Sequence, residues 1–325
     1  MTYPTRVVFP VSLIAAASLA LTGCAADDGG GGGDDATLQI VASTNVYADI
    51  AATIAGDAAE VTAIIHDAAQ DPHEYEATPR DALAIADADL VIVNGGGYDE
   101  FMHTLLEAHD TQAVVLDAVE LAGLEPESEE HNGDEHEGEE AEGDEHDHHD
   151  HGEFNEHVWY SFDAMASLAD ELASRLGELD PEGAATFTAN ADEFSAGLDT
   201  LAQRASGIAA AHPHTHVAIT EPVPLYLLDA AGLENVTPDE FSEAVEEGTD
   251  APALVVRDTI ELVADGSVAF LAYNEQTVGP QTEQVLAAAR EARTPVVSFT
   301  ELLPDGDDYL GRMGANLDAV ETALR

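Results

Sequence analysis

The sequence predicts an α/β protein in which two lobes, each with a parallel sheet, are joined by one long helix. Three observations support this prediction. Short apolar runs alternate with amphipathic stretches, one apolar stripe continues through residues 181–211, and 45% of the residues are apolar. With 325 residues, the chain is long enough for two domains that each bury a core.

The candidate strands are short apolar runs bounded by turn residues, as expected of buried parallel strands. They are Leu38–Ala42, Val61–Ile65, Leu90–Asn94 and Ala113–Leu116 in the first half, and His216–Thr220, Val268–Tyr273 and Pro295–Phe299 in the second. The candidate helices are Val46–Ala55, Arg80–Ala86, Asp99–Ala108, Ala164–Leu179, Thr249–Ala264, Thr282–Ala292 and Asp308–Leu324. This alternation indicates parallel sheets.

The segment 181–211 predicts a single helix between the lobes. Its apolar residues recur at spacings of four and three and so share one face; they are Phe187, Ala191, Phe194, Leu198, Leu201, Ala205 and Ile208. Pro181 after Asp180 suits a helix start with Asp180 as the cap. At 1.5 Å per residue the helix would run about 45 Å, as a rigid strut.

The N-terminal residues predict export and lipid attachment. Arg6 precedes an apolar run over residues 7–21 that is short for a membrane-spanning helix but typical of an export signal. The run ends in Leu21-Thr22-Gly23-Cys24, which looks like a lipobox whose cysteine receives lipid. We therefore expect a lipoprotein signal peptide at 1–23 and a flexible tether at 24–36. The alternatives are a plain signal peptide with an incidental cysteine, or a single membrane anchor.

Charge and cysteine content exclude several classes of function. The chain has 66 acidic residues against 9 arginines and no lysine, a formal net charge of -57. Nucleic acid is excluded as a partner, because phosphate binding needs clustered cations. The acidic residues are spread along the chain, which suits a hydrated surface in a salt-rich setting better than a field that concentrates cations. Cys24 is the only cysteine, which excludes an internal disulfide and any multi-cysteine zinc site.

The segment Glu125–Glu153 is dense in acidic residues and histidines and has almost no apolar residues, so we expect a disordered loop in the first lobe. Its histidines crowd near its end, at His146, His148, His149 and His151. We expect these four to form a secondary, low-affinity metal site. The alternative is a solvated linker with incidental histidines.

Two histidines and two glutamates are the candidate ligands of a main metal site. His73 lies in a proline-bounded loop after the strand Val61–Ile65, and His157 lies where the acidic segment ends. Glu221 and Glu301 each follow a predicted strand, where α/β proteins bind ligands. Each residue on its own suits an ordinary surface or capping role, and composition alone does not select these four. Together, two imidazoles and two carboxylates suit zinc, manganese or ferrous iron.

Several motifs resemble the solute-binding lipoproteins of zinc- and manganese-importing ABC transporters, a family often called cluster A-I. Asp71–Pro79 looks like the family's D-P-H-x-Y-E-x-T-P signature around the first metal-binding histidine. The stretch Glu156-His157-Val158-Trp159 looks like D-P-H-x-W, with Asn155-Glu156 in place of the usual Asp-Pro. Asp87–Gly95 and the helix after Asp180-Pro181 are also similar. The resemblance runs from about Leu38 to the C-terminus.

The resemblance implies two Rossmann-like lobes with the metal in the cleft between them. It places a first lobe at 37–180, a linking helix at 181–211 and a second lobe at 212–325. His73 and His157 would then come from the first lobe, and Glu221 and Glu301 from the second. Zinc-specialised members usually have a histidine where Glu221 stands, whereas manganese-type members have a glutamate. The last ligand is commonly an aspartate, so Glu301 is longer by one methylene.

The predicted function is the capture of a divalent transition metal outside the cytoplasm and its delivery to an ABC transporter permease. We expect a monomer without enzymatic activity, anchored by lipid to the outer face of the cell membrane. A site closed by protein ligands suits carriage, because a catalytic metal keeps an open position. The cues on metal identity disagree: carboxylates favour Mn²⁺, whereas the histidine-rich segment is a feature of zinc-specialised members. We favour Zn²⁺, with Mn²⁺ second.

Two other functions use the same residues. A secreted metallohydrolase is disfavoured, because the sequence has no H-E-x-x-H helix and no evident spare general base. A metal-buffering or adhesion lipoprotein would work without a transporter.

His214 and His216 are expected to be polar residues at a strand edge rather than ligands. The run Asn94-Gly95-Gly96-Gly97 lacks the pattern of a phosphate-binding loop.

Overall fold

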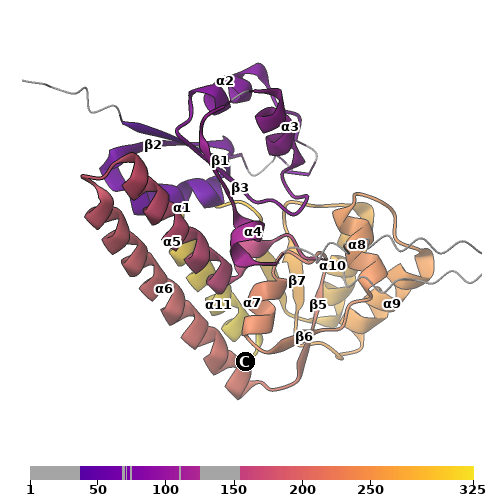
Figure 1. The fold of residues 1–325 in the computed structure, drawn as a ribbon. Helices are drawn as coiled ribbons and strands as arrows, with labels where there is room; N and C mark the ends of the chain where they lie inside the picture. Colours follow the sequence, from indigo (N-terminus) through magenta and orange to yellow (C-terminus); the bar gives the residue numbers. More distant parts are fainter. Residues whose placement is uncertain (1–36, 68–69, 71, 74, 110, 125–153) are drawn as a thin grey trace, which may run out of the picture. The chain divides into compact units, whose positions relative to one another are not determined.

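The computed structural model describes residues 37–325, apart from 68–69, 71, 74, 110 and 125–153 (Figure 1). The predicted signal peptide and tether lie outside the described residues, and so does the predicted lipid attachment point, Cys24. The four histidines of the predicted secondary metal site, His146, His148, His149 and His151, also lie outside them.

The first sheet is parallel, with the strand order β2-β1-β3-β4. Its strands are β1 (Leu38–Thr44), β2 (Ala59–Ile65), β3 (Leu90–Val93) and β4 (Val114–Asp117). Ile40 in β1 pairs with Val61 on one side and Leu90 on the other. The helices of this half are α1 (Asn45–Ala55), α2 (Pro79–Asp87), α3 (Glu100–Ala108) and α4 (Ala118–Ala122).

The second sheet is also parallel and has the order β6-β5-β7-β8. Its strands are β5 (Thr215–Ile219), β6 (Leu233–Asn235), β7 (Leu271–Asn274) and β8 (Val296–Phe299). The helices are α7 (Leu225–Ala230), α8 (Asp239–Glu246), α9 (Ala253–Ala264), α10 (Pro280–Ala292) and α11 (Tyr309–Ala323). The predicted α/β fold with two parallel sheets is confirmed, while α4, α7, α8 and β6 were not predicted.

Two long helices, α5 (Phe162–Leu179) and α6 (Ala184–Ala211), stand between the sheets in sequence and pack along each other (Figure 1). The predicted apolar stripe of α6 is confirmed, since all seven of its residues are buried. The predicted start is wrong: Asp180 caps the C-terminus of α5, its carboxylate accepts from the Glu182 N–H at 3.1 Å, and α6 begins only at Ala184. With 28 residues, α6 is about 42 Å long.

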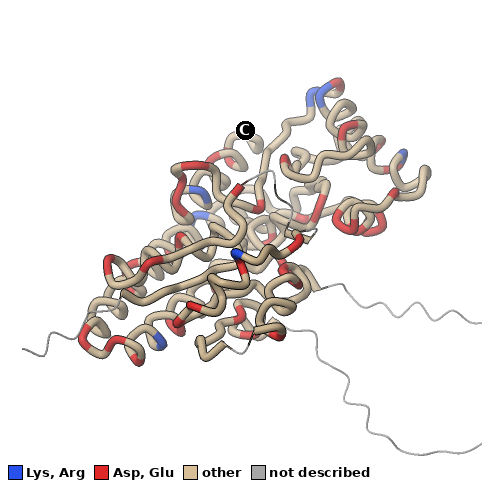
Figure 2. Tube along the Cα trace, turned by 90° about the horizontal axis from the view of Figure 1, so that it is seen from above, with Lys and Arg blue, Asp and Glu red and all other residues tan. Residues whose placement is uncertain are grey.

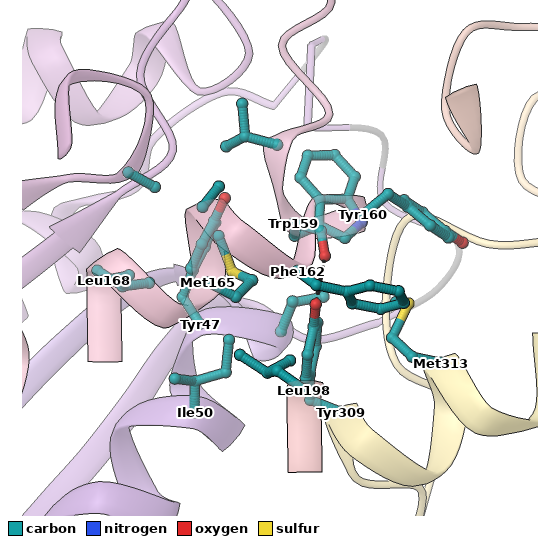
Figure 3. Packing of buried hydrophobic residues seen from close by; sticks show 14 of the residues in the cluster. Tyr47, Ile50, Trp159, Tyr160, Phe162, Met165, Leu168, Leu198, Tyr309 and Met313 are labelled. Atoms are coloured by element: carbon teal, nitrogen blue, oxygen red, sulfur yellow. Dashed lines mark hydrogen bonds between the residues drawn. The ribbon is translucent and has the colours of Figure 1, made fainter. Parts of the chain in front are cut away.

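The core continues from one half of the described chain to the other. One cluster of buried residues contains Ile40 from the first sheet and Val217 from the second, and α6 contacts α1, α5, α7 and α11. Figure 3 shows Trp159 and Tyr160 at the start of α5, above Phe162 and Tyr309. The Tyr309 hydroxyl donates to the Trp159 carbonyl at 2.6 Å. This packing fixes the segment that begins at residue 154, where a predicted ligand lies.

Acidic residues are spread along the described chain, and the few arginines are scattered among them (Figure 2). This distribution fits a hydrated acidic surface better than a single concentrated patch. Among the described helices, none combines the length and the apolar character needed to cross a membrane.

Candidate metal centre

His157 is buried and held by a neighbouring amide. It lies directly before a short 3-10 helix, η2 (Val158–Tyr160), and is 1% exposed. The Asn155 side-chain oxygen accepts from the His157 backbone N–H at 3.2 Å and lies 2.7 Å from its Nδ1. The Asn155 amide nitrogen donates to the Pro222 carbonyl at 3.1 Å, which identifies the oxygen as the atom facing the imidazole. Asn155 therefore orients His157 and connects it to the segment after β5.

The contact with Asn155 determines which nitrogen of His157 can bind a metal. An amide oxygen only accepts, so Nδ1 carries the hydrogen and Nε2 keeps its lone pair. Burial, and to a smaller extent the neighbouring His73, lowers the pKa of His157 well below its usual value. The imidazole is therefore neutral near pH 7 and offers Nε2, as metal-binding histidines with a hydrogen-bonded second nitrogen do.

His73 lies beside His157, in the loop between β2 and α2. The two imidazole centroids are 6.3 Å apart. The ring of Tyr98 contacts both edge-on, at 5.0 Å from His73 and 5.7 Å from His157. Nε2 of His73 is 3.9 Å from the carboxylate of Glu156, and the His73 side chain is 26% exposed. The structure thus brings the two predicted histidines together, one of them buried and the other accessible to solvent.

Tyr98 is positioned by the glycine-rich loop that follows β3. The residues Gly95–Gly97 have φ angles of 79°, 64° and 97°, a region that favours glycine. The Asp99 carboxylate closes the loop by accepting from the backbone N–H of Asn94 at 2.6 Å and of Gly95 at 3.0 Å. This sharp turn places the Tyr98 ring, which is 1% exposed, against the histidine pair.

The same loop approaches the segment that carries His157. A Cβ atom on Gly96 would lie 2.6 Å from the Phe154 ring. The Asn94 amide donates to the Glu156 carbonyl at 2.9 Å. The glycine run, which does not fit a phosphate loop, thus allows two backbone segments to meet at the histidines.

The two predicted glutamates are buried after strands of the second sheet. Glu301, after β8, accepts from the Tyr98 hydroxyl at 3.1 Å and from the Asn274 amide at 2.8 Å. Tyr98 therefore contacts both the histidine pair and Glu301. Glu221, separated from β5 by Thr220, is 4% exposed. Their role as ligands stays a prediction.

A third glutamate, Glu246, lies at the histidine pair and was not predicted. It is the last residue of α8, and its Oε1 is 3.6 Å from Nδ1 of His157. One donor atom each from His73, His157 and Glu246 lie within 4.8 Å of one another. Among the described residues, this is the group of three or more His, Cys, Asp or Glu side chains whose donor atoms lie that close together. Glu221 and Glu301 do not belong to it. The sequence signal was missing because α8 itself was not predicted.

Other histidines take ordinary surface positions. His214 and His216 contact the exposed Glu234 of the neighbouring strand, at 2.9 Å and 3.4 Å. His216 and Glu234 are paired across β5 and β6, as polar residues at a strand edge. The chemistry of the site therefore concentrates at His73 and His157, where imidazole nitrogen and carboxylate oxygen suit a divalent transition metal.

One protein-family model matches nearly all of the described chain. It is described as ZnuA, zinc-uptake complex component A, periplasmic, and it matches residues 40–323.

Known relatives match at low identity over most of their length. The manganese-binding lipoprotein MntA of Halalkalibacterium halodurans is 28% identical over 277 residues, which cover 78% of this chain and 80% of the relative. The manganese ABC transporter substrate-binding lipoprotein scaA of Streptococcus gordonii is 25% identical over 336 residues, covering 96% and 97%. The iron ABC transporter substrate-binding lipoprotein MtsA of Streptococcus pyogenes is 24% identical over 304 residues, covering 88% and 89%.

Solved structures share the fold. The periplasmic zinc-binding protein TroA from Treponema pallidum superposes with a TM-score of 0.67 at 20% identity, covering 88% of this chain and 98% of that one. FpvC from Pseudomonas aeruginosa in complex with Mn²⁺ gives a TM-score of 0.68 at 23% identity, covering 88% and 98%. The arrangement of two parallel four-stranded sheets is therefore shared with these proteins.

Proposed function

The chain belongs to the zinc-uptake component A family, and on this premise we propose that it captures a divalent transition metal outside the cytoplasm and delivers it to the permease of an ABC transporter. The ion is cargo, so the protein binds and releases it and is not an enzyme. The names of MntA, scaA and MtsA describe metal-binding or substrate-binding lipoproteins.

The observation that carries this proposal is the contact between two histidines far apart in sequence. The Tyr98 ring packs against both His73 and His157. His157 is buried and its pKa is lowered, so its imidazole stays unprotonated and able to bind a metal. We propose Glu221 and Glu301 of the second sheet as further ligands.

The identity of the metal is a separate proposal. The histidine pair suits Zn²⁺, which the histidine-rich segment also favoured, whereas buried carboxylates suit Mn²⁺. The manganese in the names of MntA and scaA adds weight to Mn²⁺. We propose a site that accepts both ions.

The predictions on the N-terminal region and on assembly belong to the same proposal. Cleavage before Cys24 and lipid attachment would anchor a monomer to the outer face of the cell membrane. We propose lobes at 37–180 and 212–325, which would move apart to release the ion at the permease. His146, His148, His149 and His151 would bind metal weakly and feed the main site.

Calorimetric titration of the purified mature protein with Zn²⁺ and Mn²⁺ tests the proposal. A variant without Glu125–Glu153 removes the predicted weak site, and we expect it to keep one tight site. In that background, His73→Ala should abolish tight binding, because one of two imidazoles is lost. His66→Ala, an exposed histidine from the same loop, is the matched control and should bind as before.

Two results would contradict the proposed function. The first is the absence of tight, stoichiometric binding in the variant without Glu125–Glu153. The second is equal affinity in the His73→Ala and His66→Ala variants, which would show that the site lies elsewhere.

A further inference from the structure

Glu246 contacts His157, and two roles are compatible with that contact. A carboxylate can orient an imidazole by accepting from its N–H, or it can share a metal ion with it. Asn155 already lies 2.7 Å from Nδ1 of His157, whereas the Glu246 oxygen lies 3.6 Å away, beyond hydrogen-bonding distance. Asn155 therefore already holds Nδ1, and the second role would require the Glu246 carboxylate to reach an ion bound at Nε2.

The spacing of the donor atoms fits a shared ion. Donor atoms of His73, His157 and Glu246 lie within 4.8 Å of one another. Metal–ligand bonds of about 2.0–2.2 Å allow two donors on opposite sides of one ion to be about 4.4 Å apart. This spacing is close to what one ion requires, but the Glu246 carboxylate would have to turn from the Nδ1 side of His157 toward Nε2 to reach it. The Glu246 side chain is only 17% exposed, so its carboxylate is already largely removed from solvent.

The position of Glu246 at the end of a helix makes a cation favourable there. The carbonyl end of a helix carries partial negative charge, which disfavours a carboxylate and favours a cation. The last turn of α8 contains Glu243 and Glu246 and no basic residue, and Glu247 follows it. The helix is anchored through its buried Phe241 and Val245, so this negative end stays at the histidine pair. A divalent ion would offset the repulsion.

We propose that Glu246 is a metal ligand that shifts the preference of this site toward Mn²⁺. This inference rests on the proposed function and deepens it. With Glu221 and Glu301, Glu246 would supply a third carboxylate. Hard oxygen donors in a shell of more than four ligands suit Mn²⁺, whereas Zn²⁺ usually takes four ligands.

The test compares two adjacent substitutions in the mature, full-length protein. Glu246→Gln removes the charge at the site, and Glu247→Gln removes the same charge from the exposed neighbour. Competition titrations measure the affinities for Mn²⁺ and Zn²⁺. We expect Glu246→Gln to weaken Mn²⁺ binding about tenfold or more, at least as much as losing a residue that orients a ligand. Zn²⁺ binding should change less, and Glu247→Gln should match the wild type.

Co²⁺ provides a readout that a purely structural role would not change. Its visible absorption becomes more intense as the coordination number falls to four, so the Glu246→Gln spectrum should intensify. Glu246→Asp keeps the charge on a shorter side chain, and the intensity of its Co²⁺ absorption should lie between those of the wild type and Glu246→Gln. Thermal unfolding of the metal-free variants establishes that each is folded.

Two outcomes would overturn the inference. Identical behaviour of Glu246→Gln and Glu247→Gln with both metals would remove Glu246 from the site. Equal losses for Mn²⁺ and Zn²⁺ with an unchanged Co²⁺ spectrum would make Glu246 a positioning residue. Failure of the proposed function looks different, because then the wild type binds neither metal or His73→Ala leaves binding intact.

Discussion

The first half of the described chain, from β1 to α5, and the second half, from β5 to α11, repeat one strand order and differ in chemistry. The sheets run β2-β1-β3-β4 and β6-β5-β7-β8, so corresponding strands occupy corresponding places. The first half contributes His73 and His157 to the candidate site, and the second contributes Glu246 together with the proposed ligands Glu221 and Glu301. The repeated topology thus determines where loops meet, while the residues in those loops determine the chemistry.

The two halves also differ in how they hold these side chains. His157 is fixed by Asn155 and packs against Tyr98 at 5.7 Å and Trp159 at 5.1 Å, in one buried block. The glutamates come from three separate segments: after β5, at the end of α8 and after β8. We infer that His157 is preorganised and that carboxylates from these separate segments complete the site around the ion.

Asn155→Ala is the strongest test of this preorganisation, because it removes the acceptor that orients His157. Loss of such a partner typically costs about 10–100-fold in metal affinity, and we expect a loss of that size for Zn²⁺. Asn155→Asp keeps an acceptor and should retain most of the affinity. Competition with a chelating dye measures both variants. Wild-type metal affinity in Asn155→Ala would mean that His157 does not need the contact with Asn155 to bind the ion.

The regular part of the fold was predictable from apolar periodicity. The stripe on α6 was found residue by residue, because a long helix repeats its signal over many turns. The short elements α4, α7 and β6 were missed, since a few residues carry too little periodicity. The start of α6 was misplaced because Asp180 and Pro181 also suit the turn that they form.

The two histidines that the structure brings together were predictable as candidates, and the residues that support them were not. His73 and His157 lie in motifs with specific neighbours, which is why the family resemblance identified them. Tyr98 and Glu246 reach the site through tertiary contacts that local sequence does not encode. The glycine run before Tyr98 was a usable signal, since consecutive glycines after a strand indicate a close backbone approach.

Gly96→Ala tests how tightly the first half is built around His157. Its φ is +64°, and the new Cβ would lie 2.6 Å from the Phe154 ring. We expect the free energy of unfolding to fall by about 1–3 kcal/mol, measured by thermal unfolding without metal. Gly207→Ala is the contrast, because nothing lies within 4 Å of its Cβ in α6. That change should stabilise by up to about 1 kcal/mol. Unchanged stability of Gly96→Ala would refute the tight approach.

Tyr226→Phe is expected to have the smallest effect on stability and affinity. It removes one hydrogen bond that joins the two halves. The Tyr226 hydroxyl in α7 donates to the Asn155 backbone carbonyl at 2.7 Å. Its loss should lower the free energy of unfolding by about 0.5–1.5 kcal/mol, as expected for one neutral hydrogen bond. Metal affinity should stay close to wild type, because the Asn155 side chain that orients His157 is untouched. Denaturant unfolding and competition titration separate the two effects. A loss of affinity of about tenfold or more, the size expected for Asn155→Ala, would show that this hydrogen bond from the second half also positions His157.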